Sequence, residues 1–388
     1  MSNASPATDQ AEIPLARPSL GERERTRVAE VLESSRLSRG PALAAFEARM
    51  AEVCGTDHAV AVSSGTAALH CIVRSLDLEP GAEVLTTPFS FVASTNVLLY
   101  EDLVPRFVDI DPTTFNLDVD RVADDVSPET EAILGVDVFG TPADWPALRS
   151  LADSHDLHLI DDACEAVGAS VADRPIGSFG DAAAFGFYPN KQITTGEGGC
   201  ITTNDESIAH TCRSLRNHGR SDTDHRMRHS RLGFNYRLDE LSAALGCAQL
   251  DRLDDLLAQR KRVADHYREV LTPLSDDLHL PARPSDVERS WFVYVVRLRD
   301  HFADHARDQL MEALEANGIG CAPYFPPIHL QPYHRSALGY SSGDFPVCER
   351  VSARCIALPF YPSLSRDAVR RVGRVLEENI LSLPRRNR

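Results

Sequence analysis

The chain contains 388 residues, of which 43% are hydrophobic, and its formal net charge at pH 7 is −17. This length suffices for one large and one smaller domain, each with its own core. The negative charge argues against nucleic acid and against an anionic membrane surface as the main partner, although local donors can still bind a small anion. No apolar run approaches the length that spans a bilayer.

The N-terminus and the cysteines indicate the compartment. Residues 1–12 carry neither a basic segment nor a following apolar run, so we expect a flexible tail rather than a secretory signal. The nine cysteines include no C-x-x-C pair. We therefore expect reduced thiols, most of them packing residues, in a cytoplasmic protein.

Short apolar runs alternate with helical patterns through the first half of the chain. Strands are predicted at 58–64, 82–88, 104–110, 131–139, 157–163, 181–188 and 198–204, with helices at 65–76, 90–100 and 143–156. Strands separated by helices of this size indicate a mostly parallel sheet with helices on both faces. In such sheets the ligand binds outside the carboxyl ends of the strands.

The second half predicts a smaller α+β unit. A long amphipathic helical stretch at 238–271 is expected to connect the two parts, and a strand at 289–300 and helices at 306–318 and 367–380 follow. We therefore predict a tail at 1–12, a large domain at 13–255 and a small C-terminal domain at 256–388.

The motif SSGTAAL (63–69) lies where a predicted strand passes into a helix. Free N–H groups at a helix start bind anions, and a glycine such as Gly65 lets a phosphate approach closely. Gly65 and Thr66 are therefore candidate phosphate ligands. The alternative is an ordinary helix cap, since the motif is neither a Walker loop nor a G-x-G-x-x-G fingerprint.

The motif LIDDACEA (159–166) ends a predicted strand in acidic residues, namely Asp161, Asp162 and Glu165. At the carboxyl end of the sheet, a carboxylate can hold a proton on a ring nitrogen or bind a metal. The alternative is capping of a helix by Asp. No histidine follows at ligand spacing and H-E-x-x-H is absent, so we expect no metal site.

Lysine is rare in this chain, since only Lys191 and Lys261 are lysines among 40 Lys and Arg residues. Arginine cannot be deprotonated at usable pH, whereas lysine can. We therefore interpret Lys191 as a reactive amine rather than as a residue that supplies only positive charge. The alternative is a surface lysine left by drift. Taken together, a phosphate seat, a carboxylate for a ring nitrogen and a reactive amine are what pyridoxal 5′-phosphate (PLP) requires.

With these motifs, the sequence resembles the DegT/DnrJ/EryC1/StrS family of PLP-dependent sugar aminotransferases. The resemblance covers nearly the whole chain, through motifs that include AVSSGTAALH (61–70), FVDIDPTTFNLD (107–118), FYPNKQITTGEGG (187–199) and LGFNYRLDELSAALG (232–246). It implies an α/β PLP-transferase fold of type I, with a large domain on a mostly parallel seven-stranded sheet and a smaller α+β domain.

The resemblance also implies roles for individual residues. Lys191 matches the lysine that binds the cofactor covalently, and Asp162 matches the aspartate paired with the pyridine nitrogen. Glu165 stands near the ring hydroxyl, where the family more often has Gln. Gly65 and Thr66 match the phosphate cradle.

Further matches lie outside these motifs. Phe91 matches the aromatic residue that stacks on the ring, although a core position is the alternative. Asn235 matches an asparagine that reaches the phosphate from the neighbouring subunit, and His329 matches a histidine near the substrate. Gly186 departs from the family, which usually has a serine here whose hydroxyl binds the phosphate.

The implied activity is transfer of an amino group from an amino acid, with L-glutamate expected, to a nucleotide-linked keto sugar. Perosamine-synthase-like members favour a 4-keto-6-deoxyhexose. The alternatives are a 3-keto sugar or cyclitol aminotransferase, and a non-catalytic PLP-binding regulatory protein. The resemblance further implies a homodimer with shared active sites.

Overall fold

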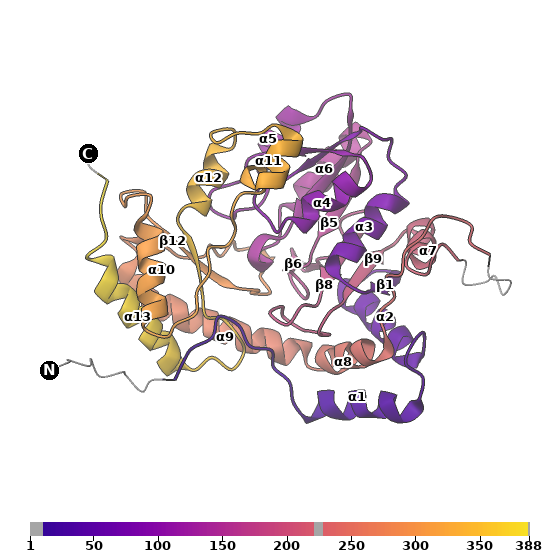
Figure 1. Ribbon diagram of the computed structural model, residues 1–388, viewed down its shortest axis with the longest axis horizontal. Coiled ribbons are helices and arrows are strands. Elements are labelled where there is room, and N and C mark those ends of the chain that lie inside the picture. Colours follow the sequence, from indigo (N-terminus) through magenta and orange to yellow (C-terminus); the bar gives the residue numbers. More distant parts are fainter. Residues whose placement is uncertain (1–10, 221–227, 387–388) are drawn as a thin grey trace.

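A seven-stranded sheet forms the larger part of the computed structural model, which describes residues 11–220 and 228–386 (Figure 1). Its strands follow the order β1 (His58–Val62), β9 (Gly199–Thr203), β8 (Ala182–Gly186), β5 (His158–Asp162), β4 (Thr130–Val136), β2 (Glu83–Thr86) and β3 (Val104–Phe107). Neighbouring strands from β8 to β3 are parallel, whereas β9 runs antiparallel to both β1 and β8. The prediction of a mostly parallel seven-stranded sheet is confirmed, and each predicted strand overlaps an observed one.

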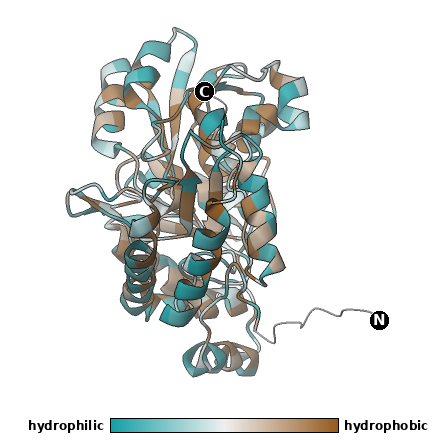
Figure 2. Ribbon diagram, turned by 90° about the vertical axis from the view of Figure 1, so that its left-hand side faces the viewer, coloured by the Kyte–Doolittle hydropathy of each residue, from teal (hydrophilic) through white to brown (hydrophobic). Residues whose placement is uncertain are grey.

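Side chains of a strand point alternately to the two faces of a sheet, and a separate apolar core lies on each face here. In β5, Ile160 belongs to one core and Leu159 to the other. The first core includes α3 (Gly65–Ser75), α4 (Ala93–Tyr100) and α7 (Glu206–Leu215), and the second includes α2 (Pro41–Cys54), α5 (Val119–Asp125) and α6 (Trp145–His155). Figure 2 shows hydrophobic strands in the middle and more hydrophilic surfaces on the helices outside them.

The predicted helices at 65–76, 90–100 and 143–156 are present as α3, α4 and α6. The predicted set lacks α2, α5, α7 and also α1 (Glu22–Ser34). The composition of α1 explains its absence, because this helix is mostly polar and buries only Glu24 and Val31. Its apolar residues at helical spacing, Val28, Val31 and Leu32, are confined to about one turn, which is too short a pattern to predict a helix.

The single helical stretch predicted at 238–271 is wrong in one respect, because it contains two helices, α8 (Glu240–Leu250) and α9 (Leu253–Leu271). The break is held by side chains, since Asp251 binds Arg49 and Arg252 binds Glu24 at 2.8 Å. α8 is buried against both α1 and α2 and is therefore apolar on most sides rather than amphipathic. Figure 1 shows α8 and α9 in succession along one side of the molecule.

The C-terminal part forms a smaller α+β unit. Its antiparallel sheet joins β10 (Leu278–His279), β12 (Tyr294–Leu298) and β13 (Cys355–Leu358), with α10 (Ala306–Ala316) and α13 (Arg366–Ile380) beside it. The core of this unit includes Val263 of α9 and also Ile13, whereas Leu256 of α9 packs under the large sheet. The division at 255/256 stays a prediction, and most of the predicted tail (1–10) lies outside the described residues.

Shorter elements complete the described chain. They are a small sheet of β11 (Val287–Glu288), β6 (Ser170–Val171) and β7 (Arg174–Pro175), the helices α11 (Pro332–Leu338) and α12 (Pro346–Ser352), and single 3-10 turns at Val138–Gly140, Thr272–Leu274 and Ile328–Leu330. Across residues 11–220 and 228–386, no helix has both the length and the apolar character needed to cross a membrane.

Candidate active site

Three segments meet at the carboxyl ends of β5 and β8. Asp162 is the last residue of β5, Gly186 is the last residue of β8, and Gly65 begins α3. A Cβ atom on Gly65 would lie 2.8 Å from Cys164 Sγ and 3.3 Å from Gly186 Cα. Glycine at position 65 is therefore required for this close approach, which brings the start of α3 against the end of β8.

The start of α3 contains both features that the motif SSGTAAL (63–69) could indicate, a helix cap and free amides for an anion. Ser64 is the helix cap, because its hydroxyl accepts a hydrogen bond of 3.0 Å from the Ala67 amide. The amides of Gly65 and Thr66 precede the first intrahelical hydrogen bond, so helix geometry leaves them available to an anion. The predicted phosphate ligands, Gly65 and Thr66, therefore lie at the carboxyl ends of the strands, and Ser64 supplies the helix cap.

Asp162 is buried and held by two donors. Its Oδ2 accepts a hydrogen bond of 2.7 Å from the Ser94 hydroxyl on α4, and its Oδ1 accepts one of 3.2 Å from the Cys164 amide. Both donors orient the carboxylate. The motif analysis missed Ser94, and the only available signal was its position in PFSFVAS (88–94), the segment that contains Phe91.

Lys191 follows β8 in a loop and faces Glu165. Its Nζ donates to Glu165 Oε1 at 3.2 Å and lies 3.9 Å from the centre of the Phe292 ring. The second oxygen of Glu165 accepts a hydrogen bond of 2.8 Å from the Phe139 amide. Burial raises the pKa of Glu165, and the Lys191 ammonium and the Phe139 amide counteract part of this rise. Glu165 is thus placed to hold the Lys191 side chain in position through this ion pair.

Asp161 does not share the face of Asp162, because neighbouring strand residues point to opposite faces. Asp161 Oδ2 accepts a hydrogen bond of 3.2 Å from the Gly177 amide, while its Oδ1 and Oδ2 of the nearby Asp137 are buried without a hydrogen-bond partner among the described residues. Asp137 Oδ1 accepts hydrogen bonds from the Ala143 amide at 2.8 Å and the Trp145 indole at 2.7 Å. These two donors favour the ionised form of Asp137, so we assign a shared proton to Asp161.

The buried acid pair gives stability a pH dependence. Burial raises the pKa of Asp137 from 3.8 to about 7, and burial together with the Asp137 charge raises the pKa of Asp161. Between these two pH values the folded state binds more protons than the unfolded state. The free energy of unfolding therefore decreases as pH rises from about 4 to about 7.

Asp161→Asn is expected to flatten this dependence, because an amide can donate to Asp137 at every pH. Urea unfolding at pH 5 and pH 8 measures the difference. The matched control is Asp173→Asn, which alters an exposed carboxylate in the β6–β7 turn and should keep the native slope. An unchanged slope in Asp161→Asn would show that the pair shares no proton.

The remaining predicted residues lie in different surroundings. Phe91 is 62% exposed, which excludes the core alternative for this side chain. Asn235 lies in a segment whose backbone pairs with Asn217 at the end of α7. His329 is completely buried, where its ring packs on Phe345 and its Nε2 lies 3.2 Å from Glu349. The substrate contact of His329 stays a prediction, because its ring is buried in this single chain and its Nδ1 has no hydrogen-bond partner among the described residues.

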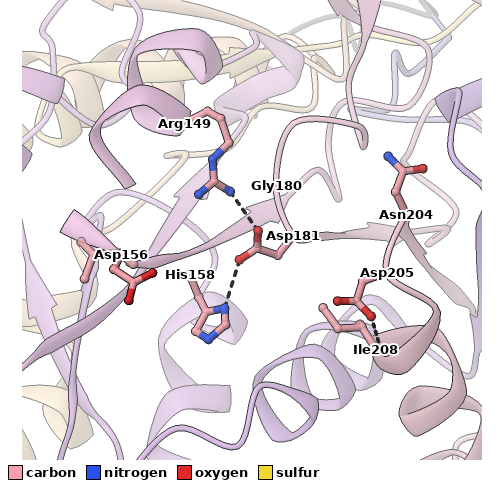
Figure 3. A pocket seen from close by; sticks show the side chains of 9 residues that line it. Arg149, Asp156, His158, Gly180, Asp181, Asn204, Asp205 and Ile208 are labelled. Carbon is pink, nitrogen blue, oxygen red and sulfur yellow. Dashed lines mark hydrogen bonds and ion pairs between the residues drawn. The ribbon is translucent and has the colours of Figure 1, made fainter. Parts of the chain in front are cut away.

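A cavity of about 650 Å³ opens elsewhere, around His158 at the amino end of β5 (Figure 3). Figure 3 shows Arg149 and His158 both directed at Asp181, with contacts of 2.9 and 3.1 Å. Both side chains are already paired with Asp181, and the ligand site of a parallel sheet lies at the opposite, carboxyl ends of the strands. The cavity is therefore separate from the candidate active site.

The groups at the carboxyl ends fit PLP. The Gly65 and Thr66 amides would hold its phosphate, Asp162 would face its ring nitrogen, and Lys191 would bind it covalently. A side chain at position 65 would collide with Cys164 and approach Gly186 closely, so only glycine keeps the backbone at the start of α3 uncovered.

Comparisons with known proteins identify relatives over nearly the whole chain. The chain is 36% identical over 372 residues to the GDP-perosamine synthase of Caulobacter vibrioides, covering 96% of this chain and 99% of the relative. It is 34% identical over 357 residues to the UDP-N-acetyl-3-dehydro-alpha-D-glucosamine 3-aminotransferase of Acidithiobacillus ferrooxidans, covering 92% and 93%.

The similarity to a solved structure extends to the fold. The Spr1654 protein of Streptococcus pneumoniae in its PLP form superposes with a TM-score of 0.90 at 25% identity, covering 96% of this chain and 99% of that chain. The sequence profile of the DegT/DnrJ/EryC1/StrS aminotransferase family matches residues 18–377. The chain is an α/β enzyme with the PLP-transferase fold of type I, its cofactor is PLP, and it belongs to the DegT/DnrJ/EryC1/StrS aminotransferase family.

Proposed function

We propose that this enzyme transfers an amino group from L-glutamate to a nucleotide-linked 4-keto-6-deoxyhexose. The observation that carries the proposal is the convergence of the Lys191–Glu165 pair and the oriented Asp162 carboxylate on the anion cradle at the start of α3. The relative named GDP-perosamine synthase supports a nucleotide-linked acceptor.

Each residue of the site has a chemical task in this reaction. PLP, when bound, supplies an electron sink that makes cleavage of a Cα–H bond possible. Asp162, oriented by Ser94 and the Cys164 amide, keeps a proton on the ring nitrogen. Lys191 Nζ would be the attachment point and, once displaced by the amine of the donor, the base that accepts the proton from Cα of the donor. Glu165 holds this amine in place between the two tasks.

The direct test is an assay of the purified enzyme with glutamate and a panel of nucleotide-linked 3-keto and 4-keto sugars. We expect amino-sugar formation to be fastest with a 4-keto-6-deoxyhexose. Absence of turnover on every sugar, together with a cofactor spectrum that glutamate leaves unchanged, would support the non-catalytic regulatory alternative.

A 3-keto sugar is the second candidate acceptor. The relative from Acidithiobacillus ferrooxidans, whose name states a 3-amination, supports it at nearly the same identity. The panel separates the two candidates, because a 3-keto sugar that reacts faster than every 4-keto sugar would reverse the proposed regiochemistry. Both outcomes keep the same roles for Lys191 and Asp162.

The proposed enzyme is cytoplasmic. All nine cysteines lie in the described residues and are free thiols, and most of them are buried. Unpaired thiols are typical of a reducing compartment. Cell fractionation with a reporter fused to the C-terminus tests this, and recovery of the fusion from the periplasmic or extracellular fraction would contradict it.

Gly186→Ser is expected to tighten PLP binding. Gly186 has no positive φ, and a Cβ atom there would lie 3.4 and 3.5 Å from Cys164 and 3.6 Å from Gly65, which is ordinary van der Waals contact. A serine hydroxyl can therefore be accommodated, and one hydrogen bond to a charged group contributes about 1.5–3 kcal/mol at best. The PLP dissociation constant decides the matter, with Gly186→Ala as the control for the added Cβ. A serine variant that binds no better than the alanine variant would contradict the missing-donor interpretation.

We further propose a homodimer in which Asn235 of each chain completes the neighbouring site. Aromatic side chains beside the site support a partner surface, since Phe91 and Tyr188 are 62% and 54% exposed in the single chain. A closed two-fold arrangement would place each Asn235 against the other chain's phosphate.

Two inactive variants should then rescue each other. Lys191→Ala removes the amine of its own site, and Asn235→Asp places a negative charge against the phosphate of the partner's site. Random pairing of equal amounts gives about half mixed dimers, in which one of the two sites has both residues intact, so about a quarter of all sites should be active. Activity per subunit after co-expression measures this. Mixed dimers confirmed by mass but without activity would place Asn235 outside the shared site.

A further inference from the structure

Arg260 is a buried cation without a carboxylate partner. It lies in the middle of α9, and only 2% of its surface is exposed. Burial lowers the pKa of its guanidinium to about 9. Within residues 11–220 and 228–386, every hydrogen-bond acceptor of its side chain is a backbone carbonyl oxygen. Burying an unpaired charge is costly, so packing alone does not account for an arginine here.

The three carbonyl groups belong to two segments that meet at the active site. Arg260 Nη2 donates to the Lys191 carbonyl at 2.6 Å. Its Nη1 donates to the carbonyl groups of Trp291 and Phe292 at 3.2 and 3.1 Å. One planar guanidinium therefore joins the loop that carries Lys191 to the segment that carries Phe292.

The same two segments meet again through their side chains. Lys191 Nζ lies 3.9 Å from the centre of the Phe292 ring while it donates to Glu165. The position of the amine thus depends on how the Lys191 peptide sits relative to the Phe292 peptide. Arg260 bonds to both peptides from a third element, α9. This helix also contributes residues to the core of the large sheet and to the core of the smaller unit.

We propose that Arg260 is a positioning residue for Lys191, which holds the amine between Glu165 and the Phe292 ring by fixing the backbone on both sides. The inference rests on the proposed function for the role of Lys191. It adds a residue that acts from outside the reacting groups, through the backbone carbonyl groups of Lys191, Trp291 and Phe292.

The chain offers a direct readout because it contains only two lysines. Lys261 is on the surface, where it pairs with Glu288, and Lys261→Arg leaves Lys191 as the only lysine. Lysine labelled with 13C at Cε then gives a single NMR signal for the full-length, cofactor-free protein. We expect the nearby Phe292 ring to shift this signal away from that of free lysine, and Phe292→Leu gives the position of the signal without the ring.

In the Lys261→Arg protein, the further change Arg260→Met is expected to move the NMR signal of Lys191 most of the way to its position in Phe292→Leu. PLP should bind about tenfold to a hundredfold more weakly, which is the range for one lost charge-assisted hydrogen bond. Turnover should fall mainly in kcat rather than in KM for glutamate, and Arg260→Lys should recover part of each loss. The control is Arg354→Met, since Arg354 is buried to a similar extent and donates to a carbonyl group, although it also pairs with Asp300 and Asp304, and it makes no contact with the Lys191 loop.

An unchanged Lys191 signal in folded Arg260→Met protein would overturn the proposal, and so would an equal change in Arg354→Met. If Arg260→Met does not fold, Arg260→Lys carries the test, and a native signal with native PLP affinity in that variant overturns the proposal. The NMR measurement needs neither PLP nor turnover. Failure of the native protein to bind PLP or to aminate a sugar would count against the proposed function alone.

Discussion

Lys191→Ala is expected to lower kcat by at least about four orders of magnitude, because the variant lacks both the attachment point and the base. Cofactor binding should survive in weakened form, since the amides at the start of α3 and the Asp162 carboxylate are untouched. Loss of the ammonium also leaves the buried Glu165 without its cation, so the pKa of Glu165 should rise further. Steady-state kinetics and the visible spectrum of the bound cofactor measure these effects.

The chain supplies an unusually clean control for this experiment, because Lys261 is the only other lysine. Its amine is exposed and pairs with Glu288 at 2.9 Å. Lys261→Arg preserves this charge and should keep native activity and the native spectrum. Turnover of Lys191→Ala within tenfold of the native rate, or a spectrum identical to the native one, would remove Lys191 from the catalytic role.

Asp162→Asn is expected to lower kcat/KM by about a hundredfold or more, whereas Glu165→Gln should cost less than about tenfold. An asparagine cannot supply the negative charge that keeps the ring nitrogen protonated, although it can still accept the Ser94 hydrogen bond. Glutamine at 165 keeps an oxygen that accepts from the Phe139 amide or contacts the Lys191 amine. Kinetics of the two variants with glutamate give the comparison.

Asp161→Asn is the matched control for Asp162→Asn, since the two acids are neighbours on one strand but point to opposite faces of the sheet. It should change the pH dependence of stability and leave kcat/KM within a fewfold of the native value. Equal losses in Asp162→Asn and Glu165→Gln would contradict the ranking of the two roles. A loss in Asp161→Asn as large as that in Asp162→Asn would mean that the Asp162 effect is a general loss of structure.

Local patterns in the sequence were sufficient to predict the strands, some of the helices around the sheet and the fold class of this protein. Runs of apolar residues and the helical stretches between them are local properties, so the seven strands and the mostly parallel sheet followed from them. The rarity of lysine singled out Lys191, and LIDDACEA placed acids at the carboxyl end of a strand. The order of the motifs then indicated the family, which the match over residues 18–377 confirms.

Only the tertiary structure decided which side chains meet. The residues themselves offered Asp161 and Asp162 side by side, and only the resemblance to the family singled out Asp162. The fold supplies the physical reason, because Asp162 accepts from Ser94 of α4 while Asp161 points to the opposite face of the sheet. Ser94 reaches Asp162 across 68 positions and Arg260 reaches Lys191 across 69. Such contacts depend on how helices pack on the sheet and leave no periodic signal, because each involves a single residue from each segment.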